Sequence, residues 1–182
     1  MKQIIVLLLM CCSVLSVNAQ KWFYDDGGSD MKRNQLGIDL SVGKMADVDG
    51  KVGFTGGVRY QYNVHRYVGI DLIGVNYVGQ TVNNEGLGPS ILQGLIGLRA
   101  KTPYFYEDFA GYLGVRMGYG HDFWLEEGGL AMEVNVGMHI SEHLLAGYVF
   151  NMQKVNLGDG FSGKYKFHGF KWDLFSKEDN HI

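Results

Sequence analysis

The sequence predicts an all-β protein: an eight-stranded antiparallel up-and-down transmembrane β-barrel that follows a cleaved signal peptide. Three observations lead to this fold class. Apolar and polar residues alternate through most of the chain, which places successive side chains on opposite faces of a strand. Gly is frequent (27) and Pro rare (2) among 182 residues, which favours twisted, closely packed strands. The connections between the alternating stretches are long and short in alternation along the chain, as in a meander whose two rims differ.

Residues 1–19 have the features of a secretory signal peptide. Lys2 supplies the positive start, a short apolar run follows, and Val17-Asn18-Ala19 is a small-residue cleavage site that would leave Gln20 first. Beyond the signal peptide we expect a periplasmic N-terminal segment over 20–33, the barrel domain over 34–175 and a C-terminal tail over 176–182.

The composition excludes several classes of function. The net charge of −3 gives no basic excess, so we expect no nucleic-acid partner. Charged residues make up 19%, below the roughly 25% of a typical soluble domain. The only cysteines, Cys11 and Cys12, would leave with the signal peptide, so disulfide and thiol chemistry are not expected.

Strict alternation predicts three of the strands. In Leu36–Gly43, Phe54–Val64 and Gly129–Ile140 the apolar residues concentrate at even positions, so each strand has one apolar and one polar wall. Five more segments alternate less cleanly and complete the set of eight: Tyr67–Val78, Ser90–Lys101, Phe109–Gly120, Leu144–Met152 and Lys164–Phe175. The phase slips near Ile73-Gly74 and near His168-Gly169, and a β-bulge at each glycine would restore it.

The connections and the register follow from these strands. Short turns are expected at Val64–Arg66, Thr102–Asp108 and Ser141–His143, and longer loops at Lys44–Gly50, Gly79–Pro89, His121–Gly128 and Gln153–Gly163. Both ends of the barrel domain then lie on the short-turn side. Pairing across the turns places Ile140 opposite Leu144, Val136 opposite Tyr148, Arg59 opposite Asp71 and Arg116 opposite Glu133.

Periodicity alone does not decide which wall faces inward, but two further features favour a polar lumen. The polar wall is poor in Lys and Glu, and small residues separate its six charges: Asp39, Arg59, Asp71, Arg99, Arg116 and Glu133. Such a set suits a narrow interior in which charges interlock. The aromatic residues gather near the strand ends in two bands, as at two membrane interfaces. The band on the short-turn side comprises Tyr60, Tyr62, Tyr67, Tyr104, Phe105, Tyr106, Phe109, Trp172 and Phe175, and the band on the long-loop side Tyr77, Tyr119, Phe123, Trp124, Phe150 and Tyr165.

Three hairpin sequences carry a resemblance to a known family: Gln61–Leu72, Gly111–Gly120 and Gly137–Phe150. They resemble the small eight-stranded outer-membrane barrels of the OmpX/OmpA-transmembrane type, and more closely the "porin family" or "outer membrane β-barrel domain" proteins of Bacteroidetes-like bacteria. The resemblance implies the outer membrane of a Gram-negative cell envelope as location, and contact with outer-membrane lipids. It also implies insertion by the barrel assembly machinery, guided by an aromatic residue that closes the last strand, here Phe175.

The sequence offers no catalytic, cofactor or metal site. His168 has no serine within two residues, and nothing fixes His121, Asp122, Glu126 and Glu127 into a ligand geometry. We therefore expect a monomeric, non-enzymatic outer-membrane barrel that serves envelope integrity, adhesion or a narrow solute path, with its lumen plugged by paired charges. Two alternatives remain: a soluble periplasmic, lipocalin-like barrel that binds a small apolar ligand, and an outer-membrane lipid-modifying enzyme.

Overall fold

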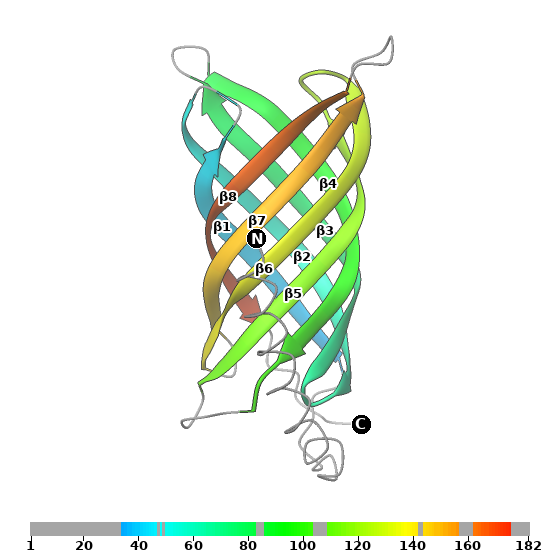
Figure 1. The fold of residues 1–182 in the computed structure, drawn as a ribbon, viewed down its shortest axis with the longest axis vertical. Helices are drawn as coiled ribbons and strands as arrows, with labels where there is room; N and C mark the ends of the chain where they lie inside the picture. Colours follow the sequence, from blue (N-terminus) through cyan, green and yellow to red (C-terminus); the bar gives the residue numbers. More distant parts are fainter. Residues whose placement is uncertain are drawn as a thin grey trace, which may run out of the picture. The chain divides into compact units, whose positions relative to one another are not determined.

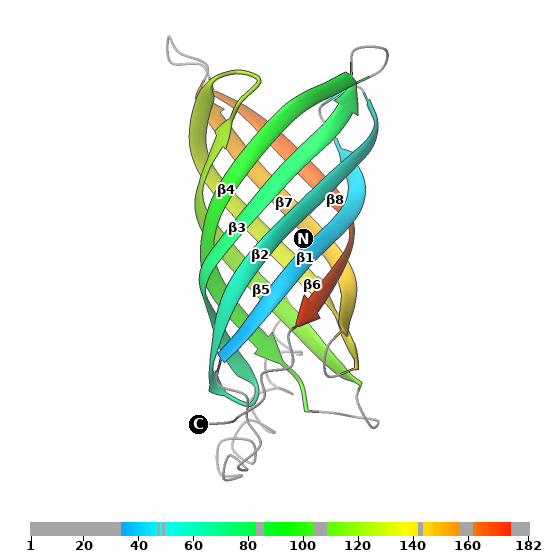
Figure 2. The same cartoon turned by 180° about the vertical axis from the view of Figure 1, so that it is seen from behind.

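The computed structural model describes residues 34–46, 48, 50–82, 86–103, 109–141, 144–156 and 162–175. These residues form eight strands, each paired antiparallel with the next along the chain, and the last strand pairs with the first to close a barrel (Figures 1 and 2). The predicted up-and-down barrel is therefore confirmed. The expected signal peptide, the segment 20–33 and the tail 176–182 lie outside the described residues.

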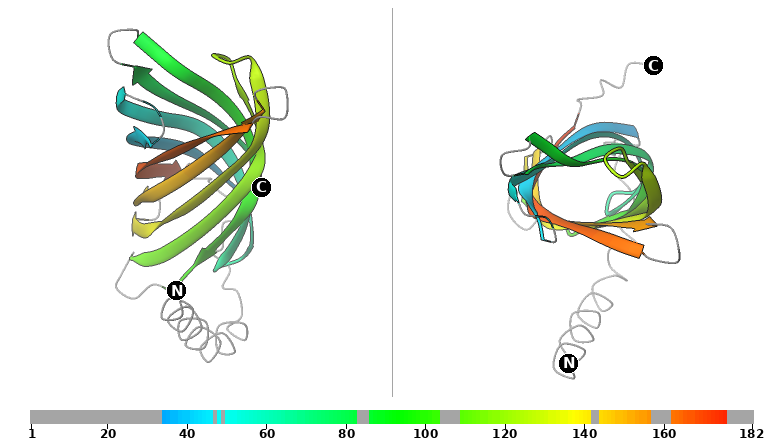
Figure 3. Two further views of the ribbon diagram at one scale, coloured as in Figure 1. Left: turned by 45° about the horizontal axis from the view of Figure 1, so that its top comes forward. Right: turned by 90° about the horizontal axis from the view of Figure 1, so that it is seen from above.

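All eight strands lie where alternation predicts them. Their bounds are β1 Asn34–Met45, β2 Gly50–His65, β3 Val68–Val82, β4 Gly86–Lys101, β5 Ala110–Asp122, β6 Glu127–Ser141, β7 Leu144–Asn156 and β8 Ser162–Phe175. They tilt around the barrel axis and enclose one interior (Figure 3). We call the end that carries the β1–β2, β3–β4, β5–β6 and β7–β8 connections the upper rim, as drawn in Figure 1. The other end, where β1 starts and β8 ends, is the lower rim.

The expected alternation of long and short connections fails at β4–β5, and the connections of the upper rim are shorter than expected. The strands continue through most of the polar, Gly-rich segments of the upper rim; Gly120 still pairs with Gly129, and Asp122 with Glu127. The connection between β4 and β5, at the lower rim, spans 102–109 and is the longest in sequence. The reason is that the backbone ladder does not depend on apolar side chains, so pairing continues after the apolar alternation stops.

One of the two predicted bulges is present. The partners on β3 shift from Ile73, opposite Tyr60, to Asp71, opposite Gln61. Leu72 and Ile73 consequently both face outward, with 45% and 64% of their surfaces exposed. The register near the β2–β3 turn also differs from the predicted one, since Asn63 lies opposite Gly69. The predicted pairing of Arg59 with Asp71 is therefore wrong: Asp71 lies opposite Gln61, and Arg59 lies opposite Gly74.

The second predicted bulge is absent. The register of β8 with β7 and with β1 runs without a shift past His168 and Gly169. Phe167 breaks the sequence pattern only because it is an apolar residue that faces the interior, where it is 1% exposed. A shift does occur at the β6–β7 turn, where Ser141 rather than Ile140 lies opposite Leu144, while Val136 lies opposite Tyr148 as predicted.

The two walls of the barrel have opposite polarity. Side chains on the outer wall are apolar and exposed, among them Leu36, Ile38, Leu40 and Val42 on β1. The inner wall is polar and buried. Among the described residues, no helix is long and apolar enough to cross a bilayer. A soluble lipocalin-like barrel would place its apolar wall inside, so the observed polarity is that of a transmembrane barrel, with its apolar surface turned to lipid.

Aromatic side chains lie near both rims of the outer wall. Tyr119, Phe123 and Trp124 are exposed near the upper rim, and Tyr60 and Trp172 near the lower rim. Two residues assigned to these bands from the sequence face elsewhere. Phe175 is buried in the interior, and Tyr165 packs against a buried apolar cluster, because both occupy inward-facing positions of the unbroken β8 register. Tyr104, Phe105 and Tyr106 lie outside the described residues.

The outer wall should tolerate a charge only near a rim. Val136 is 53% exposed on the outer face of β6, away from both rims, whereas Val52 is 47% exposed near the upper rim of β2. We expect Val136→Arg to cost about 2–4 kcal/mol of folding free energy in lipid vesicles and Val52→Arg only about 0–1 kcal/mol. Urea unfolding followed by tryptophan fluorescence measures both. Equal losses would show that this wall does not face hydrocarbon.

Candidate functional site in the barrel interior

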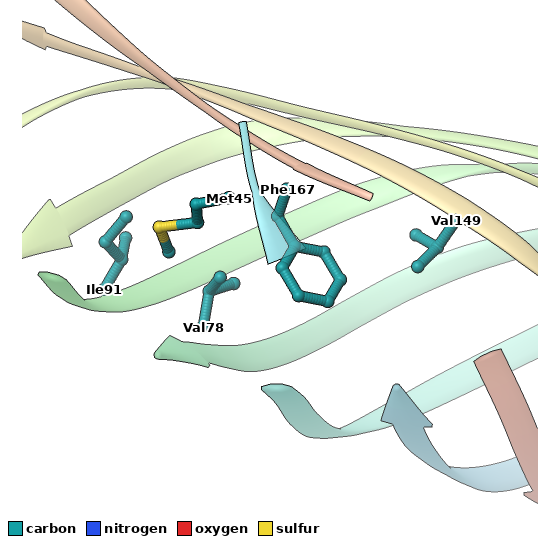
Figure 4. Packing of buried hydrophobic residues seen from close by; sticks show 5 residues of the cluster. All are labelled: Met45, Val78, Ile91, Val149 and Phe167. Carbon is teal, nitrogen blue, oxygen red and sulfur yellow. The ribbon is translucent and has the colours of Figure 1, made fainter. Parts of the chain in front are cut away.

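The interior is filled in levels, and the level nearest the upper rim is apolar. Met45, Val78, Ile91, Val149 and Phe167 form a buried cluster whose side chains converge from five strands (Figure 4). Val48 and Tyr165 pack against it. We call these seven residues the upper apolar cluster. It occupies the interior toward the upper rim, together with the buried polar side chains of Gln80 and Asp122.

Amide side chains form a second level and satisfy one another. Gln93 and Asn151 exchange hydrogen bonds of 2.9 and 2.8 Å across the barrel, from β4 to β7. The Nε2 of Gln153 donates to the backbone carbonyls of Gly120 and Gly129 at 3.1 and 3.0 Å. Buried amides are stable only when both their donors and acceptors find such partners.

Eight charged side chains form the central level, and we call them the interior charge cluster. All are at most 2% exposed. Four are acidic and four basic, so their formal charges cancel: Asp39, Asp71, Glu133 and Asp173, with Arg59, Arg99, Arg116 and Lys171. They come from every strand except β7.

Asp39 is the first of three carboxylates that each bind more than one cation. Its Oδ2 lies 2.9 Å from Nη1 of Arg116 and 3.3 Å from Nζ of Lys171, and its Oδ1 lies 3.4 Å from Nη1 of Arg59. Charge-assisted contacts of this kind compensate the loss of hydration that each ion suffers on burial.

Asp173 on β8 is the second such carboxylate. Its Oδ2 accepts from Nη2 of Arg59 at 2.8 Å and from Nη2 of Arg99 at 3.1 Å. Its Oδ1 lies 3.7 Å from Nζ of Lys171. Arg59 therefore bridges Asp39 and Asp173, and Lys171 joins the same two carboxylates from the other side.

Glu133 is the third, and it has the largest set of partners. Its Oε1 accepts from Nη2 of Arg116 at 2.5 Å and from Nζ of Lys171 at 2.7 Å. Three amides complete its shell: Asn135 donates to Oε1 at 2.9 Å, and Asn76 and Asn151 donate to Oε2 at 3.0 and 3.4 Å. Arg116 and Glu133 are direct neighbours on β5 and β6, as the sequence register predicted.

Two of the ion pairs cross the lumen. In an eight-stranded barrel, β1 lies opposite β5 and β4 lies opposite β8. Arg116 on β5 contacts Asp39 on β1, and Arg99 on β4 contacts Asp173 on β8. The central level is therefore closed by side chains that meet from opposite walls at hydrogen-bonding distance.

The sequence places all six of its candidate residues in the interior, but five of them interact directly and Asp71 does not. Asp71 makes no ion pair within 4 Å to any residue that the structure describes, and its Oδ1 has no hydrogen-bond partner there. The register of β2 with β3 explains this, since Asp71 lies opposite Gln61, two positions away from Arg59. Sequence reasoning missed Lys171 and Asp173; unbroken alternation along β8 would have assigned both to the inner wall.

Below the charge cluster, two aromatic residues and a leucine fill the interior. Tyr112, Leu145 and Phe175 form a second buried cluster near the lower rim. The guanidinium of Arg59 lies 4.7 Å from the ring centre of Phe175, and that of Arg99 lies 4.9 Å from the ring centre of Tyr112. Cation–π contacts of this kind gain strength away from water. The end of the last strand is thus tied to the charge cluster.

The arrangement stabilises buried charged side chains inside a narrow barrel. The described residues do not form a metal site in addition. Among them, no group of three or more His, Cys, Asp or Glu side chains could hold a metal ion. His168 lies near the lipid-facing wall, where its Nδ1 is 2.6 Å from the hydroxyl of Tyr148. His139 packs edge-on against Tyr112 in the interior, with ring centres 6.0 Å apart.

Among the comparisons with known proteins, the match to Neisserial surface protein A agrees with this fold. No protein-family model and no curated protein sequence matches the chain. Neisserial surface protein A has a TM-score of 0.50 at 15% identity, over 79% of this chain and 97% of that one. The N-terminal β-barrel domain of Pseudomonas aeruginosa OprF (8% identity) and a transmembrane β-barrel designed de novo (14% identity) each give 0.46, over 80% of this chain and 98% of theirs. Fold and wall polarity together define the class: a small transmembrane β-barrel.

The contribution of the charge cluster to the free energy of unfolding should depend on its ion pairs rather than on burial alone. Glu133→Gln keeps the size of the side chain and its amide neighbours but leaves Arg116 and Lys171 undercompensated. We expect it to lower the free energy of unfolding by about 3–5 kcal/mol. The matched variant Asp71→Asn, at a buried carboxylate without a direct ion pair, should lose less than half as much. Urea titrations in one detergent compare the two variants. A loss at Asp71→Asn as large as at Glu133→Gln would contradict this interpretation.

Proposed function

We propose that the protein is a non-enzymatic barrel of the bacterial outer membrane whose lumen is closed by the interior charge cluster. In this proposal it belongs to the small eight-stranded outer-membrane barrels that its sequence resembles, and it is inserted as a monomer by the barrel assembly machinery. Its role is to maintain the envelope or to present its upper rim to a partner, and it does not conduct solutes.

The observation that carries the proposal is the pair of contacts that cross the lumen. Arg116 reaches Asp39 at 2.9 Å, and Arg99 reaches Asp173 at 3.1 Å, each from the opposite wall. A ring of charges around a water-filled pore would keep its members hydrated and apart. Here the carboxylates and cations are in direct contact and at most 2% exposed.

The size of the barrel supports the same conclusion. Eight strands enclose a space that side chains can fill, whereas aqueous channels belong to much wider barrels. The upper apolar cluster lies above the charge cluster and the Tyr112–Leu145–Phe175 cluster below it. A solute would have to displace three packed levels to pass.

The outer membrane as location rests on the sequence and the outer wall. Residues 1–19 fit an export signal, and the exposed apolar wall needs lipid. Absence of enzymatic activity is proposed because the groups that commonly act as acid, base or nucleophile are used in other contacts. Glu133 and Asp39 bind cations, and His168 is hydrogen-bonded to Tyr148 on the lipid side.

Single-channel recording in a planar bilayer tests the closed lumen. Protein extracted from the outer-membrane fraction should give no stable conductance, because the ion pairs must break before ions can pass. Glu133→Gln should lower the unfolding midpoint without creating a steady open level.

Two outcomes would contradict the proposal. A steady open level whose cation preference shifts in Glu133→Gln would make the charge cluster a selectivity ring. Recovery of the protein in osmotic-shock fluid instead of the outer-membrane fraction would contradict the location.

A further inference from the structure

Four lysines lie together at the upper rim on the adjacent strands β7, β8 and β1. Lys154 and Lys164 are direct partners on β7 and β8. Lys166 follows on the same face of β8. Lys44 is on β1, where it lies opposite His168 of β8. Lys44, Lys154 and Lys164 are exposed and Lys166 is half-buried, and the alternation of each strand turns all four outward. We call this group the basic ledge.

The outer face of β1, β7 and β8 carries lysines but no carboxylate. Asp39 and Asp173 are the only acidic residues of β1, β7 and β8, and both are buried in the barrel interior. Asp47, Asp49 and Asp159 stand in the adjoining connections in sequence, outside the described residues. The lipid-facing side of these three strands therefore carries four lysines within four residues of the strand ends at the upper rim.

The apolar wall begins directly below the basic ledge. Val42, Phe150 and Phe170 are 50%, 42% and 65% exposed on β1, β7 and β8. Tyr148 and His168 lie at the boundary, joined by their 2.6 Å hydrogen bond, and the ring of Tyr148 packs edge-on against Phe170. A molecule that binds here would meet cations at one end and a broad apolar surface at the other.

The rim is asymmetric around the barrel. At the same height, the hairpin of β5 and β6 presents Tyr119, Phe123 and Trp124, and its turn carries Glu126 and Glu127. Aromatic residues suit any membrane interface. The four lysines with described outward-facing side chains at this rim lie on three adjacent strands, which indicates a local preference for anions on that side.

We propose that the basic ledge binds the phosphate-bearing headgroup of an anionic lipid, whose acyl chains lie against the apolar wall at Val42, Phe150 and Phe170. Lysine stems can lie along an apolar surface while their ammonium groups reach the headgroup level. Each lysine near an anionic membrane surface strengthens binding roughly fivefold. The proposal requires the barrel to span a bilayer, but it does not depend on whether the lumen is closed.

Native mass spectrometry of the full barrel tests the proposal. The protein is first folded into vesicles of phosphatidylcholine with an equal amount of phosphatidylglycerol, then extracted with its bound lipids. We expect retained phosphatidylglycerol to exceed phosphatidylcholine at least fivefold, by the same arithmetic of roughly fivefold per lysine. The double variant Lys154→Gln/Lys164→Gln should lower this ratio at least fivefold. The double variant Arg66→Gln/Lys177→Gln, which removes the same formal charge and leaves all four ledge lysines in place, should leave the ratio unchanged.

Three other results would overturn the proposal or its premise. Equal loss of preference in both double variants would mean that net charge, not the ledge, selects the lipid. Displacement of the retained lipid by inorganic phosphate would mean that the ledge binds free phosphate without acyl chains. The folded barrel migrates faster than the unfolded chain on a cold gel, and absence of this shift in either type of vesicle would contradict membrane spanning itself.

Discussion

The structure depends on one constraint: charges buried in a barrel too narrow for bulk water must neutralise one another. Asp39, Glu133 and Asp173 each meet this requirement by binding at least two cations, and two of these contacts join opposite walls. The paired side chains also need space in this narrow interior, and glycines on the inner wall provide it. A Cβ on Gly37 would approach both Arg59 Nε and the Phe175 ring to 3.2 Å, so the smallest residue leaves room for the arginine and the aromatic ring.

The outer wall follows from the inner one. Because the polar groups turn inward, the apolar side chains have to face a solvent in which they are stable, and lipid is that solvent. The closed ladder leaves no strand edge unpaired within the barrel, which a bilayer requires of any spanning structure. Where the outer wall reaches the upper rim, it changes to lysines on β7, β8 and β1 and to aromatic residues on β5 and the β5–β6 turn. The two sides of the barrel therefore meet the headgroups differently.

Alternation with period two predicts most of the fold, since side chains in a strand must face alternate walls. It predicts the eight strands, the pairing of Arg116 with Glu133 and the outward face of Val136. It fails where the inner wall contains apolar residues. Phe167 on β8 suggests a phase slip that does not exist, and this hides Lys171 and Asp173 from the sequence. Contacts across the lumen, such as Arg99 with Asp173, depend on the closure of the barrel and have no local signal.

The most direct test of the cross-lumen ion pairs is a double-mutant cycle on Asp39 and Arg116, which lie on opposite strands. The cycle compares the free energies of unfolding of the native chain, Asp39→Asn, Arg116→Gln and the combined variant, in one detergent. If the 2.9 Å contact between the two walls stabilises the barrel, the two residues should couple by at least about 1.5 kcal/mol. Losses that add to within about 0.5 kcal/mol would show that the residues act independently and that no ion pair spans the lumen.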